Sequence, residues 1–132
     1  MFLLYFQIGC PYSINALNLL SDYHLDFLKV DINDQIRKQL VNEYNHYTMP
    51  AIFYYDKNID ITSLSASSMI PVKLSFIGGY DKLLKLFNIL SSLKSDNIKK
   101  VWNEYNNSNK MDYKTFLKIA IEFNTLLAHG TP

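Results

Sequence analysis

The chain has 132 residues, enough for one compact domain, and 48% hydrophobic residues let it bury a core without metal ions or cross-links. Its 13 basic and 12 acidic residues leave a net charge of +1, which gives no electrostatic reason to expect nucleic acid or a membrane surface as a partner. The single cysteine excludes an internal disulfide and suits a reducing compartment. We therefore expect a soluble, cytoplasmic protein.

The first part of the chain predicts strands alternating with helices. Residues 2–8 form a short apolar run that is typical of a buried strand. Pro11 suits the first turn of a helix, which apolar residues at helical spacing extend to about Tyr23. A second strand covers residues 27–32, and Asp34 is the expected N-cap of the next helix. This β-α-β-α order favours parallel pairing of the two strands.

The middle of the chain predicts two further strands and a helix. A strand over residues 51–55 begins directly after a proline. Residues 56–71 are polar and serine-rich, and they predict an extended loop. A fourth strand covers residues 71–77, two glycines end it, and a helix begins at Asp81.

The tail differs from the rest in being helical throughout. Asp96 is the expected cap of one helix, and the polar run 106–109 is expected to break it. Asp112 is the expected cap of a last helix with an apolar stripe. We expect this tail to pack on the preceding domain. The predicted division is a domain over residues 1–93, with the extended loop 56–71, and a helical C-terminal extension over residues 94–132.

Cys10 lies between the first strand and the first helix. The unpaired N–H groups and the dipole at a helix N-terminus favour an anion, so a thiol at this place has a pKa below its usual value of about 8.5. Ser13 is placed to donate a further hydrogen bond to the sulfur. The thiolate is the form that attacks disulfides. The alternative interpretation is that Cys10 is a small buried hydrophobic residue.

Three motifs in order resemble those of the glutaredoxin family. Cys-Pro-Tyr-Ser at residues 10–13 resembles the family's Cys-Pro-Tyr-Cys in its monothiol form. Thr-Met-Pro at residues 48–50 resembles its Thr-Val-Pro, whose proline is cis and faces the thiol, and residues 77–81 resemble its Gly-Gly turn into a helix. The resemblance covers residues 1–93. It implies an α/β, thioredoxin-like fold with a four-stranded mixed sheet flanked by helices.

The resemblance also implies glutathione as co-substrate, bound in a groove beside the catalytic Cys10. Pro11, Tyr12 and Ser13 would support the active site. The implied glutathione-binding residues are Gln7, Tyr12, Arg37, Thr48, Met49, Pro50, Gly79, Tyr80 and Asp81. Gln7 stands where many family members carry a lysine, and this departure removes a positive charge near the sulfur.

The implied activity is reduction of glutathione mixed disulfides by a monothiol mechanism that needs only Cys10. The expected partners are glutathione and glutathionylated proteins or small mixed disulfides. One alternative is a [2Fe–2S] cluster bridged by Cys10 of two chains and two glutathiones, in a homodimer, although Pro11 stiffens the site against this. Others are a redox-inactive adaptor for a protein partner and a shortened glutathione transferase, for which the tail is too short. The histidines at 24, 46 and 129 lack metal-ligand spacing and are expected at the surface, so no metal site is predicted.

Overall fold

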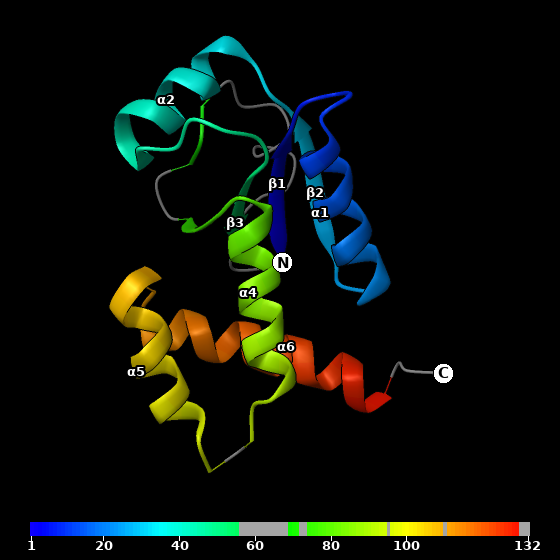
Figure 1. The fold of residues 1–132 in the computed structure, drawn as a ribbon, viewed down its shortest axis with the longest axis vertical. Helices are drawn as coiled ribbons and strands as arrows, with labels where there is room; N and C mark the ends of the chain where they lie inside the picture. Colours follow the sequence, from blue (N-terminus) through cyan, green and yellow to red (C-terminus); the bar gives the residue numbers. More distant parts are fainter. Residues whose placement is uncertain (56–68, 72–73, 95, 110, 130–132) are drawn as a thin grey trace.

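A four-stranded mixed sheet forms the centre of the computed structural model (Figure 1). The structure describes residues 1–55, 69–71, 74–94, 96–109 and 111–129. The strands are β1 (Phe2–Phe6), β2 (Phe27–Asp31), β3 (Ala51–Tyr54) and β4 (Ser75–Gly78), in the spatial order β2-β1-β3-β4. β1 pairs with β2 in parallel and with β3 antiparallel, and β4 is antiparallel to β3. The predicted α/β, thioredoxin-like fold is confirmed.

Helices cover both faces of the sheet, because the side chains of β1 are buried on both sides. Phe2 and Leu4 point toward α1 (Pro11–Asp22) and α4 (Tyr80–Ser91). Leu3 and Tyr5 point toward α2 (Asp34–Tyr44). This two-sided burial explains why β1 reads as a continuous apolar run rather than as an alternating one.

The helical tail shares the main core, as expected from its apolar stripe. It consists of α5 (Ile98–Asn109) and α6 (Tyr113–His129), and α6 packs across the C-terminal half of α4 (Figure 1). The Phe123 ring lies 5.3 Å from Phe87 and 5.1 Å from Tyr23, centroid to centroid. Glu122 accepts a 2.6 Å hydrogen bond from the Tyr54 hydroxyl on β3. The division at residue 93 stays a prediction.

Three helix caps were predicted, and the structure places two of them at other residues. Asn33, not Asp34, caps α2, because its extended backbone lets Oδ1 accept from the Ile36 N–H at 2.8 Å. α5 begins after Asn97, whose carbonyl accepts from the Val101 N–H, so Asp96 is not its cap. The cap on α6 is confirmed: Asp112 Oδ1 accepts from the Thr115 N–H at 2.9 Å.

The predicted helix break at residues 106–109 is wrong, because α5 continues to Asn109. Two aromatic anchors outweigh the weak helix propensity of this polar run. Tyr105 is buried, and the Trp102 indole N–H donates to the Met111 carbonyl at 2.8 Å. The described part of β4 begins at Ser75 rather than at residue 71, and α4 begins one residue early, at Tyr80. Most of the predicted loop 56–71 lies outside the described residues, which resume at 69.

Candidate functional site

A tight turn presents Cys10 at the start of α1. β1 ends at Phe6, and the Cys10 N–H donates to the Gln7 carbonyl at 3.1 Å, which closes the turn. Gly9 has a φ of +82°, a conformation that favours glycine at the third position of such a turn. Cys10 itself is extended, and Pro11 is the first helical residue, where its missing N–H costs nothing. The chain thus places the thiol at the positive end of a helix.

The helix start favours the ionised sulfur. The backbone N–H of Ser13 lowers the pKa of the Cys10 thiol, and the Ser13 hydroxyl and the Tyr12 N–H lower it further, while slight burial opposes them. Ser13 is fully buried, and its oxygen also accepts from the Gln7 N–H at 3.3 Å, which fixes the hydroxyl beside the sulfur. Cys10 is only half-buried, so its side chain is not sealed in the core. These are the conditions in which a cysteine acts as a nucleophile.

The loop before β3 approaches the thiol from the other side. The Met49–Pro50 peptide bond is cis, and both residues are buried. The Cys10 sulfur lies 3.9 Å from the Met49 carbonyl oxygen. The fold therefore brings together two of the three motifs, although they lie far apart in the sequence.

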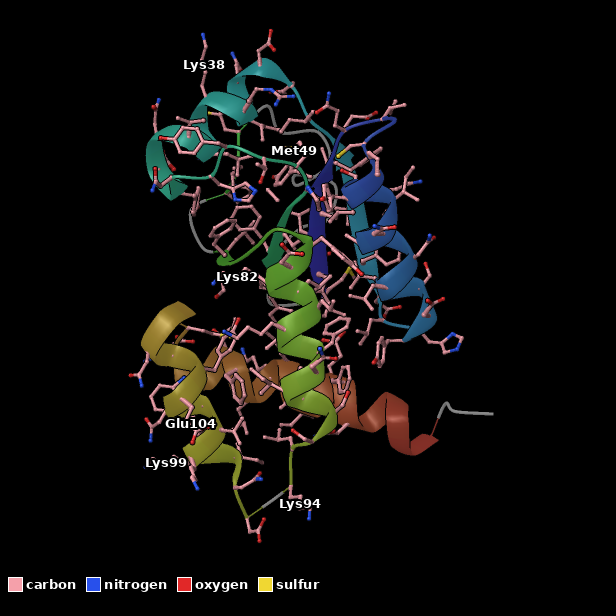
Figure 2. The ribbon with its side chains drawn as sticks, in the orientation of Figure 1. Lys38, Met49, Lys82, Lys94, Lys99 and Glu104 are labelled. Atoms are coloured by element: carbon pink, nitrogen blue, oxygen red, sulfur yellow. The ribbon has the colours of Figure 1, made fainter. Side chains whose placement is uncertain are left out.

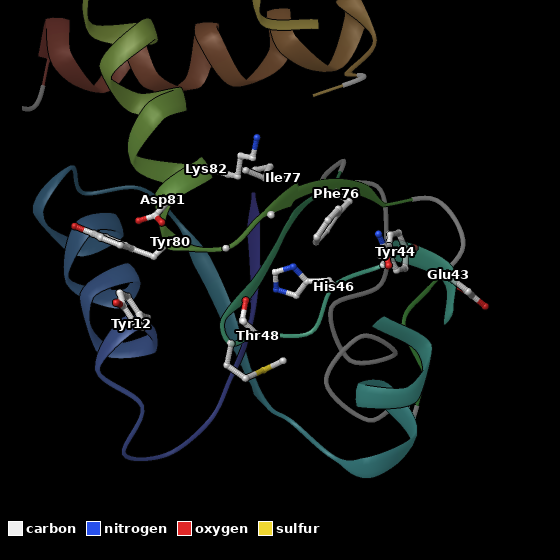
Figure 3. A pocket seen from close by; sticks show the side chains of 14 residues that line it. Tyr12, Glu43, Tyr44, His46, Thr48, Phe76, Ile77, Tyr80, Asp81 and Lys82 are labelled. Carbon is white, nitrogen blue, oxygen red and sulfur yellow. The ribbon is translucent and has the colours of Figure 1, made fainter. Parts of the chain in front are cut away.

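A groove of about 1060 Å³ runs from this point along the start of α4 (Figure 3). Figure 3 shows Tyr12, Tyr80 and Asp81 toward one end, Glu43 and Tyr44 toward the other, and His46 between them. The predicted site residues that line it are Tyr12, Thr48, Met49, Gly79, Tyr80 and Asp81. The groove is thus built by the elements that carry the three motifs.

Six predicted site residues lie outside the lining of the groove: Gln7, Cys10, Pro11, Ser13, Arg37 and Pro50. Cys10 adjoins it through Tyr12 and Met49, which do line it. Gln7 is exposed in the turn before Cys10, Arg37 is half-buried in the first turn of α2, and Pro50 is buried. Arg37 and Gln7 therefore do not line the groove that six of the predicted residues share.

The N-terminus of α4 opens into the groove. Gly79 is its N-cap residue and provides no side-chain cap, so the N–H groups of Tyr80 and Asp81 are available to an anion. Of the two glycines in this turn, Gly78 is the one that the backbone requires. Its φ is +131°, and a Cβ there would lie 2.7 Å from Lys82 Cγ. A Cβ at Gly79 would make only ordinary contacts of 3.5 Å or more.

His46 is a groove residue that the sequence prediction missed. It is half-buried, not a surface residue as expected. Its Nε2 lies 3.0 Å from the Pro50 carbonyl oxygen, and because that oxygen only accepts, Nε2 carries the hydrogen. The ring packs edge-on against Phe76 on β4, with centroids 5.3 Å apart. His46 therefore ties the loop that carries Met49 to the strand beside it. In the sequence, the one indication of this role is that His46 lies four residues before Pro50.

The far half of the groove also lay outside the prediction. Its lining residues there are Glu43, Tyr44, Asn45 and Phe76, and the prediction of site residues also omitted Ile77, Gly78 and Lys82 around the turn into α4. They come from the end of α2, from β4 and from the start of α4, so only the tertiary fold brings them together. Within the described ranges, no three His, Cys, Asp or Glu side chains are grouped to hold a metal ion, and no helix is long and apolar enough to cross a membrane.

Comparison with known proteins agrees with the motifs at residues 10–13 and 48–50. Residues 3–59 match the family model described as Glutaredoxin. No curated protein matches the sequence. The matched segment holds the Cys10 turn, α1, α2 and the loop with the cis proline, and it ends before β4 and α4. The match supports a thiol oxidoreductase type of function, and residues 3–59 of the chain are similar to the glutaredoxin family.

Proposed function

We propose that the protein reduces glutathione mixed disulfides through Cys10 alone, by a monothiol mechanism. The observation that carries the proposal is the placing of one half-buried thiol at a helix N-terminus that lowers its pKa, 3.9 Å from the Met49 carbonyl and at the end of a groove. A sulfur whose thiolate form is favoured, beside a cleft, suits attack on a disulfide whose one half lies in that cleft.

The reaction proceeds by two exchanges at sulfur. The Cys10 thiolate attacks the glutathionyl sulfur of the mixed disulfide, a Cys10–glutathione disulfide forms, and the substrate sulfur leaves as a thiolate that takes a proton from water. The thiolate of a second glutathione then attacks the glutathionyl sulfur on Cys10. Oxidised glutathione is released and the Cys10 thiolate is restored. One substrate disulfide is reduced for each molecule of oxidised glutathione formed.

In this proposal, different groove residues bind different parts of the glutathionyl group. The N–H groups of Tyr80 and Asp81 at the start of α4 suit the γ-glutamyl carboxylate, and the Asp81 carboxylate suits its ammonium group. The backbone of Met49 suits strand-like pairing with the central residue of the tripeptide. In this proposal Arg37 reaches the glycine carboxylate only by extending its side chain from α2, because it does not line the groove.

The proposal is tested with a small glutathione mixed disulfide and a glutathione-coupled assay. Because the chain has one cysteine, omission of free glutathione should trap a single adduct, which mass spectrometry would place at Cys10. Cys10→Ser should abolish both the adduct and turnover. Asn18→Ala, an exposed change on the same helix, is the matched control and should retain both. Turnover by Cys10→Ser at the unmodified rate would contradict the mechanism.

A further inference from the structure

The surface around Cys10 divides into a charged side and an uncharged side. On the groove side, Glu43, Asp81 and Lys82 line the cleft. On the other side, no Asp, Glu, Lys, Arg or His occurs in the sequence before Asp22, so the side chains of the first turns of α1 and of the turn around Cys10 are neutral apart from the Cys10 thiolate itself. Figure 2 shows this separation, with Lys38 on α2 and Lys82 at the start of α4 on one side of Met49 and α1 on the other.

The uncharged side also exposes apolar side chains. Ile8 in the turn is 78% exposed, Tyr12 is 59% exposed and Ile14 is 49% exposed. Because Ser13 points into the core, its neighbours Tyr12 and Ile14 point outward on opposite sides of the exposed Pro11. We call Ile8, Pro11, Tyr12 and Ile14 the apolar collar. Tyr12 belongs to both surfaces, since it also lines the groove.

The chemistry of disulfide exchange determines what lies against this collar. This step rests on the proposed function, in which the groove holds the glutathionyl half of the substrate. With each S–S distance at about 2 Å, the leaving sulfur stands within roughly 4–5 Å of Cys10 when its bond breaks. A protein that carries this sulfur must therefore touch the surface that glutathione leaves free, and that surface is the collar.

We propose that the collar docks a substrate protein whose glutathionylated cysteine is surrounded by uncharged, apolar residues. A charged residue pressed against the collar would lose water and find no counter-charge among its four members, whereas an apolar residue would be stabilised by burial. The nearest charges on the adjacent strand, Lys29 and Asp31, are of opposite sign and favour neither kind of charge. Specificity then comes from rejection of charged surroundings as well as from apolar contact.

The small size of the collar favours a transient substrate over a second copy of the chain. Stable interfaces take about 20–30 residues from each partner, and the collar offers four side chains around one thiol. A brief encounter also suits an enzyme that must release its product after each exchange. A dimer through this face is therefore one of the outcomes that the experiment must separate.

The experiment uses three glutathionylated peptides that differ only in the residues beside the modified cysteine: leucine, glutamate or lysine. The full chain should favour the leucine peptide over both charged ones by about tenfold in kcat/KM, which corresponds to about 1.4 kcal/mol. Ile14→Lys should shift the preference toward the glutamate peptide, and Ile14→Glu toward the lysine peptide. Ile121→Lys is the matched control, because Ile121 is 59% exposed on α6, and it should keep the original order.

The crossed pattern separates docking from a change in thiol pKa. A charge that acted only on the Cys10 pKa would change the rates on all three peptides in the same direction, and that result would overturn the proposal. Equal rates on the three peptides, with normal turnover of a small mixed disulfide, would also overturn it and leave the proposed function intact. No turnover of any disulfide would defeat the proposed function and this inference together. A dimer at assay concentration that Ile14→Lys dissociates, seen by light scattering, would show that a second copy occupies the collar.

Discussion

Two helices begin at the groove, and their first turns differ in one respect. α1 starts at Pro11 after Cys10 and has no acidic residue in its first turn, whereas α4 starts at Tyr80 after Gly79 and carries Asp81 there. No side-chain cap occupies either N-terminus. At α1 the anion is the resident thiolate. At α4, under the proposed function, it is a carboxylate of the ligand, so the same backbone electrostatics serve once for reactivity and once for binding.

The largest effect is expected at His46, which ties the loop beside Cys10 to the strand that leads into α4. His46→Phe keeps the ring contact with Phe76 but leaves the buried Pro50 carbonyl without its donor. We expect the free energy of unfolding to fall by about 1–3 kcal/mol and KM for glutathione to rise, with the Cys10 pKa changed little. Urea unfolding and steady-state kinetics would measure these quantities.

His46→Gln is the matched comparison, because its amide N–H₂ can donate to the same carbonyl. It should recover most of both losses. If His46→Phe binds glutathione as well as the original chain does, His46 has no positioning role at the groove.

A smaller effect is expected from Ser13→Ala at the α1 terminus. The change removes the hydroxyl that lowers the Cys10 pKa and keeps the larger contribution of the Ser13 backbone N–H. We expect the pKa to rise toward its usual value and turnover at pH 7 to fall by about 3- to 10-fold. This fall in turnover is smaller than the loss of a hydrogen bond to a charged group would usually cause, because solvent also stabilises the thiolate.

The pH dependence has a definite sign. The thiol has a lowered pKa in the folded chain, so the thiolate and its stabilisation are lost as the pH falls through that value. Ser13→Ala should therefore be slow at neutral pH and nearly normal at about pH 9, close to the usual thiol pKa. Iodoacetamide alkylation rates against pH measure this directly. Ser21→Ala at the far end of α1 is the control, and an unchanged alkylation profile for Ser13→Ala would contradict the assigned role.

The smallest effect is expected from Asp81→Asn at the α4 terminus. The amide keeps the shape of the side chain and removes the charge proposed to meet the glutathione ammonium group. Because the site is open to solvent, we expect KM for glutathione to rise by about 2- to 5-fold, with kcat and the Cys10 alkylation rate unchanged. Asp34→Asn, in the first turn of α2, does not touch the groove and should leave KM as it was. A fall in the alkylation rate with Asp81→Asn would mean that the two termini are not independent.

The thiol side of this site is visible in the sequence because its signals are local. Pro11 marks the start of a helix directly after an apolar strand, so the position of Cys10 follows from short-range rules. The far half of the groove has no such signal. His46 and Phe76 meet only because β4 lies beside β3, and a 30-residue separation hides that contact from any local pattern. Helix propensity also predicted a break after Tyr105, where burial of that side chain carries the helix on.

The hydrogen bond between Tyr54 and Glu122 has a practical consequence for anyone who trims this chain. Tyr54 ends the strand that starts just after Pro50, and Glu122 lies on a helix whose inner face is buried against Phe87 and Tyr23. A fragment ending at residue 93 would present those rings to water and would be prone to aggregation. The last helix covers one side of the hydrophobic core, so a shortened chain for expression should retain it.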